Sequence, residues 1–135
     1  MINEEEIEVL YNNNYSNWRI SKKAIELYIL RSNVTNFELD FCCRNDPILI
    51  QIYKDLGDDF NDKSSITKIK KILKKYENYY YIEAEYGKEH IKIDFIKCKL
   101  YTIYNKIKEI LHDNNNNNNN IKIKEIEEFI STIEL

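Results

Sequence analysis

The sequence predicts an α+β domain built on a small, mainly antiparallel sheet. Three observations lead to this class: an alternating run at 79–95 interrupted by Gly87, apolar residues at helical spacing in other segments, and helix-capping residues directly before two of those segments. A length of 135 residues suits one domain with its own core. We expect a hairpin at 79–95 to pack against amphipathic helices near 21–32, 47–56 and 96–112, followed by a C-terminal helix near 122–134.

The first two predicted elements are a strand and a helix. IEVLY (7–11) has the composition and alternation of a half-buried strand. Ser21 can cap the helix formed by SKKAIELYILR. The apolar side of that helix consists of Ala24, Leu27 and Tyr28. We therefore expect this side to face the core.

A second strand and a second helix follow. FELDFCC (37–43) alternates apolar and polar residues, which is the period of a half-buried strand. In DPILIQIYKDLG, Asp46 can cap the helix, Pro47 suits its first position, and Gly57 suits a left-handed exit. The residues spaced for one face of this helix are Leu49, Ile52, Tyr53 and Leu56.

A third strand precedes the hairpin. ITKIKKIL (66–73) has isoleucines spaced by three, but its β-branched content and its place before the hairpin favour a strand. In the hairpin, Gly87 and Lys88 form a two-residue connection that begins with glycine, which is typical of a type II′ turn. The register that follows pairs Ala84 with Ile91, Ile82 with Ile93, Glu83 with Lys92 and Glu85 with His90. One face of the hairpin is then apolar and the other charged.

The last predicted elements are two helices joined by a run of asparagines. IKCKLYTIYNKIKEILHD keeps the helical period through Leu100, Ile103, Ile107, Ile110 and Leu111. NNNNNNN (114–120) is typical of a flexible, solvated linker. IKIKEIEEFISTIEL (121–135) has isoleucines at coiled-coil-like spacing and needs a surface to pack on. We expect residues 1–113 to form a single α+β domain, and 121–135 to dock on it in cis, or in trans on a second subunit or a partner.

Composition argues against several classes of function. Twenty basic and 23 acidic residues give a net charge of −3, so no global electrostatic attraction to nucleic acid or to an anionic membrane is expected. The cysteines Cys42, Cys43 and Cys98 lack metal-ligand spacing, and His90 and His112 do not suggest a zinc site. The two glycines stand apart, so no phosphate-binding loop is expected. The odd number of cysteines fits a reducing, intracellular compartment, and the absence of a long apolar run predicts a soluble protein. No cofactor is expected, because the sequence contains no cofactor motif.

The order of WRISKKAIELY, RNDPILIQIYKDLG and YYYIEAEYGKE resembles a family of small uncharacterised proteins of large amoeba-infecting DNA viruses and some bacteriophages. The family pattern has a central Arg-x-Asp-Pro, a helix ending in Leu-Gly, and an Ile-Glu-Glu-Tyr-Asp-Gly-x-Glu hairpin, where this chain has AEYG at the turn. The resemblance implies a viral α+β protein, located in the host-cell cytoplasm or in the virion. It implies no activity, because none is established for the family. The matching motif residues are Arg44, Asp46, Pro47, Gly57, Glu83, Gly87 and Glu89.

Arg44 and Asp46 have two interpretations. They could contact an anion near a helix start, where free backbone N–H groups favour negative charge. The plainer account is that Asp46 caps the helix and Arg44 pairs with an acid such as Asp40. We favour the second interpretation.

A basic segment also has two interpretations. Lysines with aromatic neighbours are the chemistry of a surface that binds phosphates and stacks bases. Lysines on an exposed strand edge also discourage aggregation, and we favour this simpler role. The residues with a potential nucleic-acid contact are Lys68, Lys70, Lys71, Lys74, Lys75 and Tyr76.

The charged face of the hairpin is the remaining candidate for chemistry. Glu83, Glu85 and Asp94 could form an acid/base or metal site, but a solvated face of cross-strand pairs is the favoured interpretation. We therefore expect a non-enzymatic interaction or accessory factor with a protein partner, or with a second copy of itself. Weak nucleic-acid binding through 63–81 is the alternative.

Overall fold

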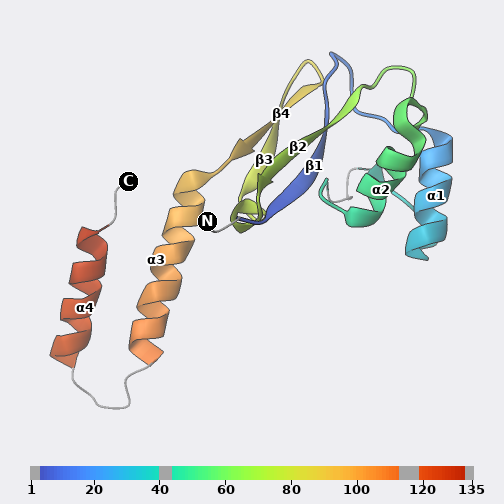
Figure 1. Ribbon diagram of the computed structural model, residues 1–135. Coiled ribbons are helices and arrows are strands. Elements are labelled where there is room, and N and C mark those ends of the chain that lie inside the picture. The colour runs from blue at the N-terminus through green and yellow to red at the C-terminus, as the bar shows by residue number, and fades with distance from the viewer. Residues whose placement is uncertain (1–3, 40–43, 113–118, 133–135) are drawn as a thin grey trace. The chain divides into compact units, whose positions relative to one another are not determined.

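The computed structural model describes residues 4–39, 44–112 and 119–132, and it confirms the α+β class (Figure 1). The chain divides into two compact units, Met1–Ile93 and Asp94–Leu135. Within the described residues, the first unit contains four strands and two α-helices, and the second contains two further α-helices. The strands form two separate two-stranded antiparallel sheets, β1–β2 and β3–β4.

The helices of the first unit, α1 (Lys22–Ser32) and α2 (Pro47–Leu56), begin where the sequence predicts. The Ser21 hydroxyl accepts a hydrogen bond from the backbone N–H of Ala24 at 3.1 Å. The Asp46 carboxylate accepts one from the second residue of α2 at 2.9 Å. Both caps satisfy backbone N–H groups that have no partner within the helix, so the chain enters each helix at a fixed residue.

The end of α2 also follows from the sequence. Gly57 has a φ of 58°, in the range that glycine tolerates best, although its ψ of −129° lies outside the left-handed helical region. It begins a short 3₁₀ turn, η2 (Gly57–Phe60). Of the predicted core face of α2, Leu49 and Ile52 are fully buried.

Strands β1 (Glu6–Asn12) and β2 (Thr67–Leu73) confirm two of the predicted strands. Leu10 lies opposite Ile69 in their antiparallel register. A 3₁₀ turn, η3 (Lys74–Tyr76), follows β2 and leads to the hairpin. These two strands are far apart in the chain, so their pairing brings the N-terminal segment beside the segment that precedes the hairpin.

The hairpin is formed by β3 (Tyr80–Glu85) and β4 (Lys88–Ile93), but its predicted turn is wrong. The two connecting residues are Tyr86 and Gly87, with φ values of 52° and 88°, rather than Gly87 and Lys88. Two positive φ angles are the mark of a type I′ turn, whose twist matches that of the strands.

The shifted turn changes every predicted pair in the hairpin. The observed pairs are Ile82 with Ile91, Tyr80 with Ile93, Ala84 with Glu89, Glu83 with His90 and Glu85 with Lys88. The register moves by two residues, so the same side chains still share each face. The predicted apolar and charged faces are therefore retained, although the predicted Glu83–Lys92 and Glu85–His90 pairings are not formed.

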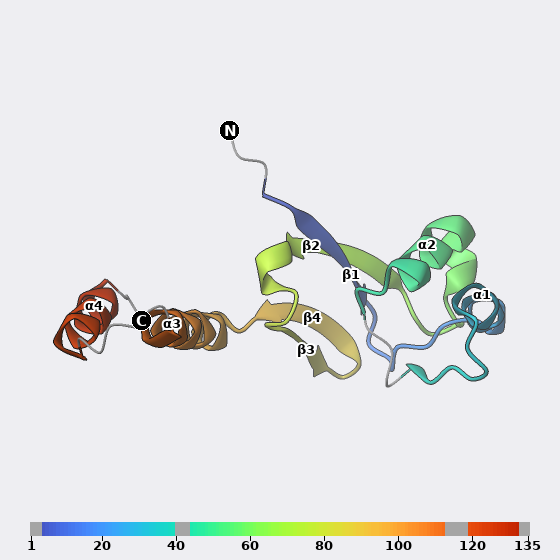
Figure 2. The ribbon, with the colours of Figure 1, turned by 90° about the horizontal axis from the view of Figure 1, so that it is seen from below.

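The β1–β2 ribbon has an apolar cluster on each face. On one face Leu10 packs with α1, α2 and Phe60. On the other face Val9 and Ile72 pack against Ile91 of the hairpin. The hairpin therefore contributes its apolar face to the β1–β2 ribbon, and Figure 2 shows the two ribbons one above the other.

The strand predicted at 37–43 is not present in its described part. Residues 37 and 38 have no regular structure, residue 39 belongs to a 3₁₀ turn, and 40–43 lie outside the described residues. Phe37 and Leu39 nevertheless pack against the first apolar cluster. Their alternation therefore reports the burial of two side chains in a connecting segment and not a strand.

The second unit consists of α3 (Phe95–His112) and α4 (Asn119–Ser131), which lie side by side (Figure 1). Both helices match the predicted positions closely. The predicted division into 1–113, 114–120 and 121–135 stays a prediction, since α3 groups with α4 here.

Candidate functional site

The family-motif residues Arg44 and Glu89 form a two-point ion pair. Arg44 Nη1 lies 2.7 Å from Glu89 Oε1, and Nη2 lies 2.8 Å from Oε2. Glu89 is only 7% exposed. The partner proposed for Arg44 from sequence, Asp40, lies outside the described residues; the acid that the structure pairs with Arg44 is Glu89.

The surroundings of this pair come from β1 and the segment after it. The backbone N–H of Asn12 donates to Glu89 Oε1 at 2.7 Å, and the backbone N–H of Leu10 donates to the Arg44 carbonyl at 2.9 Å. The Arg44 guanidinium also lies 3.8 Å from the centre of the Trp18 ring. Among the described residues, no buried side-chain nitrogen or oxygen lacks a hydrogen-bond partner, as the burial of charged groups requires.

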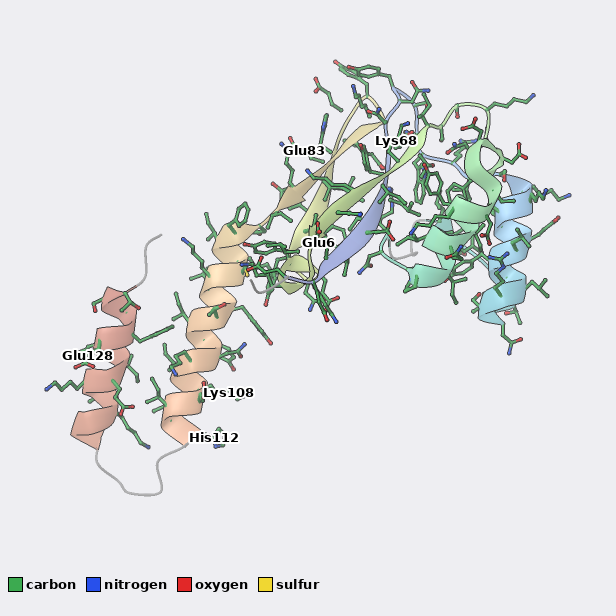
Figure 3. The ribbon with its side chains drawn as sticks, in the orientation of Figure 1. Glu6, Lys68, Glu83, Lys108, His112 and Glu128 are labelled. Carbon is green, nitrogen blue, oxygen red and sulfur yellow. The ribbon has the colours of Figure 1, made fainter. Side chains whose placement is uncertain are left out.

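Gly87 brings the hairpin turn against the chain near Ser16. A Cβ at Gly87 would overlap the carbonyl group of Ser16, and the Asn12 side chain donates to the Gly87 carbonyl at 3.2 Å. Glycine is therefore required at position 87 by a close backbone approach as well as by its positive φ. Another motif residue, Glu83, is exposed on the charged face of the hairpin (Figure 3).

Asp46 and Pro47 complete the motif at the start of α2. Asp46 uses one carboxylate oxygen for the cap and the other to accept a hydrogen bond from the Tyr28 hydroxyl at 2.5 Å. These contacts tie α1 to α2. The motif residues that the structure brings together are thus occupied by each other and by neighbouring backbone, which favours the structural interpretation of the motif.

The charged face of the hairpin contains two residues of the predicted cluster together with His90 and Lys92. Glu83, Glu85, His90 and Lys92 are exposed. Asp94 follows β4 and caps α3, because its Oδ1 accepts a hydrogen bond from the backbone N–H of Lys97 at 2.9 Å. It belongs to the second unit, so the predicted Glu83, Glu85 and Asp94 cluster stays a prediction.

Asp55, a carboxyl group with a shifted pKa, lies away from this face, on α2. Hydrogen bonds from Gln51 and then from Arg31 hold the pKa of the Asp55 carboxyl below its ordinary value. Arg31 and Asp55 join α1 to α2 at 2.8 Å. Over the described ranges, no group of three or more His, Cys, Asp or Glu side chains could hold a metal ion. Nor is any helix within those ranges long and apolar enough to cross a membrane.

The basic segment does not present its residues on one surface. Lys68 and Lys70 share the β2 side that faces the hairpin, and the Lys70 ammonium donates to the Ile91 carbonyl at 3.4 Å. Lys71 is on the other side of the strand. Lys74 pairs with Glu5 at 3.2 Å.

Lys75 and Tyr76 complete that segment. The Lys75 ammonium lies 5.1 Å from the centre of the Tyr76 ring. Tyr76 is half-buried and packs against the second apolar cluster, so this ring serves the fold.

Among the described residues, most of the exposed large apolar side chains lie in the second unit. At 3.6 residues per turn, the leucines and isoleucines of α3, together with Tyr104, form one stripe about 120° wide, whereas Phe95 and Tyr101 lie outside it. Ile103 and Ile110 lie on one edge of this stripe, and Ile110 is buried. Leu100, Tyr104 and Leu111 lie on the other edge and are 54–58% exposed.

Helix α4 covers only one edge of that stripe. A hollow between the helices is lined by Lys106 and Ile110 of α3 together with Glu125, Glu128 and Phe129 of α4, which marks the level at which they meet. On α4, Ile126 and Phe129 are half-buried, whereas Ile123 and Ile130 are more than 50% exposed. Each helix therefore leaves one flank of its apolar stripe uncovered.

The two uncovered flanks face the same side. Viewed along each helix from its first residue to its last, the exposed apolar residues lie clockwise from the residues that contact the other helix. Antiparallel helices, viewed along one axis, wind in opposite senses, so these flanks point the same way. We call this surface the open face; it consists of Leu100, Tyr104, Ile107, Leu111, Ile123 and Ile130.

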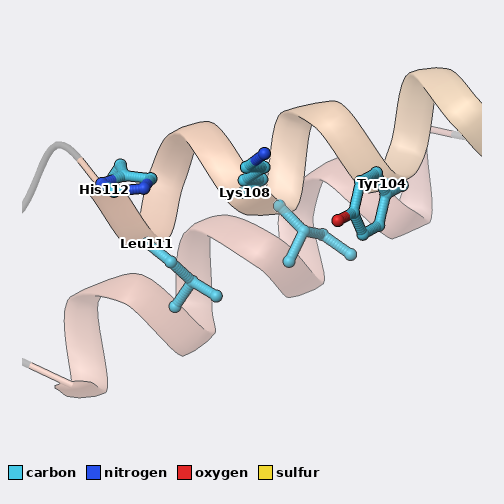
Figure 4. A pocket seen from close by; sticks show the side chains of 5 residues that line it. Tyr104, Lys108, Leu111 and His112 are labelled. Carbon is cyan, nitrogen blue, oxygen red and sulfur yellow. The ribbon is translucent and has the colours of Figure 1, made fainter.

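The α3 part of the open face has a shallow hollow of about 380 Å³ (Figure 4). Its lining residues are Tyr104, Ile107, Lys108, Leu111 and His112. The sequence predicted the amphipathic stripe correctly. It could not show that α4 covers only half of it, because periodicity identifies a face and not what covers that face.

Comparison with known proteins gives no relative for this chain. No protein-family model matches it, and no curated protein and no solved structure matches it significantly. The resemblance of the motif residues to the viral family therefore stays a prediction.

Proposed function

We propose that this protein is a non-enzymatic protein-interaction or accessory factor that binds its partner through the open face of the helical unit. The observation that carries the proposal is the exposure of Leu100, Tyr104 and Leu111 on one flank of α3. Contiguous exposed apolar side chains of this kind are typical of interaction sites. The non-enzymatic part rests on the sequence, which contains no catalytic motif.

In this proposal the motif residues of the first unit stabilise its own fold. Its motif residues are used for the Arg44–Glu89 pair, the α2 cap and the Gly87 turn, which leaves partner binding to the helical unit. The motif resemblance adds the proposal of a viral origin, with the protein acting in the host cell or in the virion.

Affinity capture with matched variants tests the proposal. The tagged full chain, Leu100→Glu and Leu30→Glu are compared in lysate from the cells that produce the protein. Leu30 is a leucine of α1, 76% exposed and outside the open face, so its variant is the control. We expect the wild type and Leu30→Glu to retain the same protein, untagged copies of this chain included, and Leu100→Glu to lose it. Equal retention by all three would contradict the proposal.

Nucleic-acid binding by the basic segment remains the alternative, favoured only by the exposure of Lys68, Lys71 and Lys75. Fluorescence anisotropy with single- and double-stranded oligonucleotides at low salt would detect it. Binding that weakens steeply with added salt would support this alternative. Flat traces would remove it.

A further inference from the structure

The two helices of the second unit carry opposite net charge. α3 has four lysines and one glutamate, a net charge of +3, whereas α4 has two lysines and three glutamates, a net charge of −1. At the outer edges of the open face, α3 places Lys108 and α4 places Glu127. The charges of two copies are therefore complementary when α3 of one copy faces α4 of the other.

Symmetry leaves two ways to bring two open faces together. A two-fold axis across the helices would set α3 against the α3 of the second copy, so that lysine-rich helices face each other. An axis parallel to the helices sets α3 against the α4 of the second copy. Both arrangements make every neighbouring pair of helices antiparallel, but only the second brings unlike charges together.

We propose that two copies of this chain pair through their open faces about an axis parallel to the helices and form a four-helix bundle. This rests on the proposed function and names its partner as a second copy of the same chain. Lys106 and Ile110 lie at the level of Glu125 and Glu128 within one copy. Lys108 of one copy then lies at the level of Glu127 of the other.

The size of the open face sets the expected affinity. The 13 residues of α4 span about 20 Å, and two adjacent helices are about 20 Å wide. This footprint, about 400 Å² per copy, is below the standard size of specific interfaces and in the range of weak, transient ones, so we expect a reversible dimer with a Kd on the order of 10 μM or weaker.

Sedimentation equilibrium of the full chain tests the proposal. Wild type and Leu30→Glu should show the same monomer–dimer equilibrium. Leu111→Glu should weaken it by at least about tenfold, because Leu111 is 54% exposed on the open face beside the first turns of α4, and the variant places a charge among the apolar side chains of the interface. Circular dichroism checks that each variant keeps its helix content.

Charge reversal provides a second test that leaves the apolar residues intact. Lys108→Glu and Glu127→Lys should each weaken the dimer by about threefold, through like-charge contact across the interface. The double variant should return to within about twofold of wild type. A double variant as weak as the singles would overturn the proposed arrangement.

The result also separates this proposal from the proposed function. A chain that stays monomeric up to about 500 μM would overturn dimerisation. If capture of another protein still depended on Leu100 in that case, the proposed function would stand and only its partner would change. If the chain stays monomeric and capture does not depend on Leu100, both proposals are overturned.

Discussion

Arg44 and Glu89 are 45 residues apart in the chain and form a two-point ion pair on the apolar face of the hairpin, with N···O distances of 2.7 and 2.8 Å. Arg44 precedes α2, and Glu89 lies in β4. The backbone N–H of Asn12 completes the carboxylate's contacts. One interaction thus joins the start of a helix, the first strand and the hairpin of the α+β unit.

Removing one member of this pair should destabilise the fold strongly. Glu89→Ala leaves the half-buried Arg44 without its counter-ion, so we expect a loss of about 3 kcal/mol in the free energy of unfolding by urea. Glu83→Ala, on the exposed face of the same hairpin, should change it by less than about 0.5 kcal/mol. Similar values for the two variants would show that the pair does not stabilise the unit.

The two glycines should differ in their tolerance of alanine. Both have positive φ, but a Cβ at Gly57 meets open space, whereas one at Gly87 overlaps the Ser16 carbonyl. Gly57→Ala should cost about 1–2 kcal/mol from backbone strain alone. Gly87→Ala should cost at least about 1 kcal/mol more, because the hairpin must also move away. Equal losses in urea unfolding would argue against this close approach.

The hairpin turn predicts a stabilising substitution. Tyr86 is 85% exposed and has a φ of 52°, a conformation that asparagine adopts more readily than tyrosine. Tyr86→Asn creates the Asn-Gly pair preferred in type I′ turns and should raise stability by about 0.5 kcal/mol. The turn predicted at Gly87 and Lys88 gives no reason for such a gain. A melting temperature at or below wild type would count against the observed turn.

Asp55 should contribute a small acid dependence to the stability of the first unit. Its pKa is lowered, chiefly by the hydrogen bond from Gln51 and then by that from Arg31, so the fold favours the ionised form. The contribution is present above the ordinary pKa of 3.8 and is lost as the pH falls through the lowered value. Asp55→Asn should therefore melt slightly below wild type at neutral pH and approach it in acid. A gap that widened in acid would contradict this sign.

Local signals predicted most of the elements. Ser21 and Asp46 cap their helices as expected because capping depends only on neighbouring residues. The pairing of Arg44 with Glu89 depends on tertiary contacts that no local pattern encodes. The alternation of the hairpin could not separate its two registers, because a shift of two residues keeps every side chain on the same face.

The open face shows the same limit at the candidate site. The apolar period of α3 was visible in the sequence, and so was the excess of lysine on that helix. The flank left open by α4 follows from how the two helices meet, through Ile110 and Phe129. The signal that could have suggested an interface is the contrast in net charge between the two helices.

Hydrogen–deuterium exchange measured as a function of protein concentration tests most directly whether the helical unit carries the interface. Raising the concentration from about 1 to about 200 μM should slow exchange in Phe95–His112 and Asn119–Ser131 and leave β1–β4 unchanged. Slower exchange confined to the strands, or no change anywhere in the chain, would contradict the account.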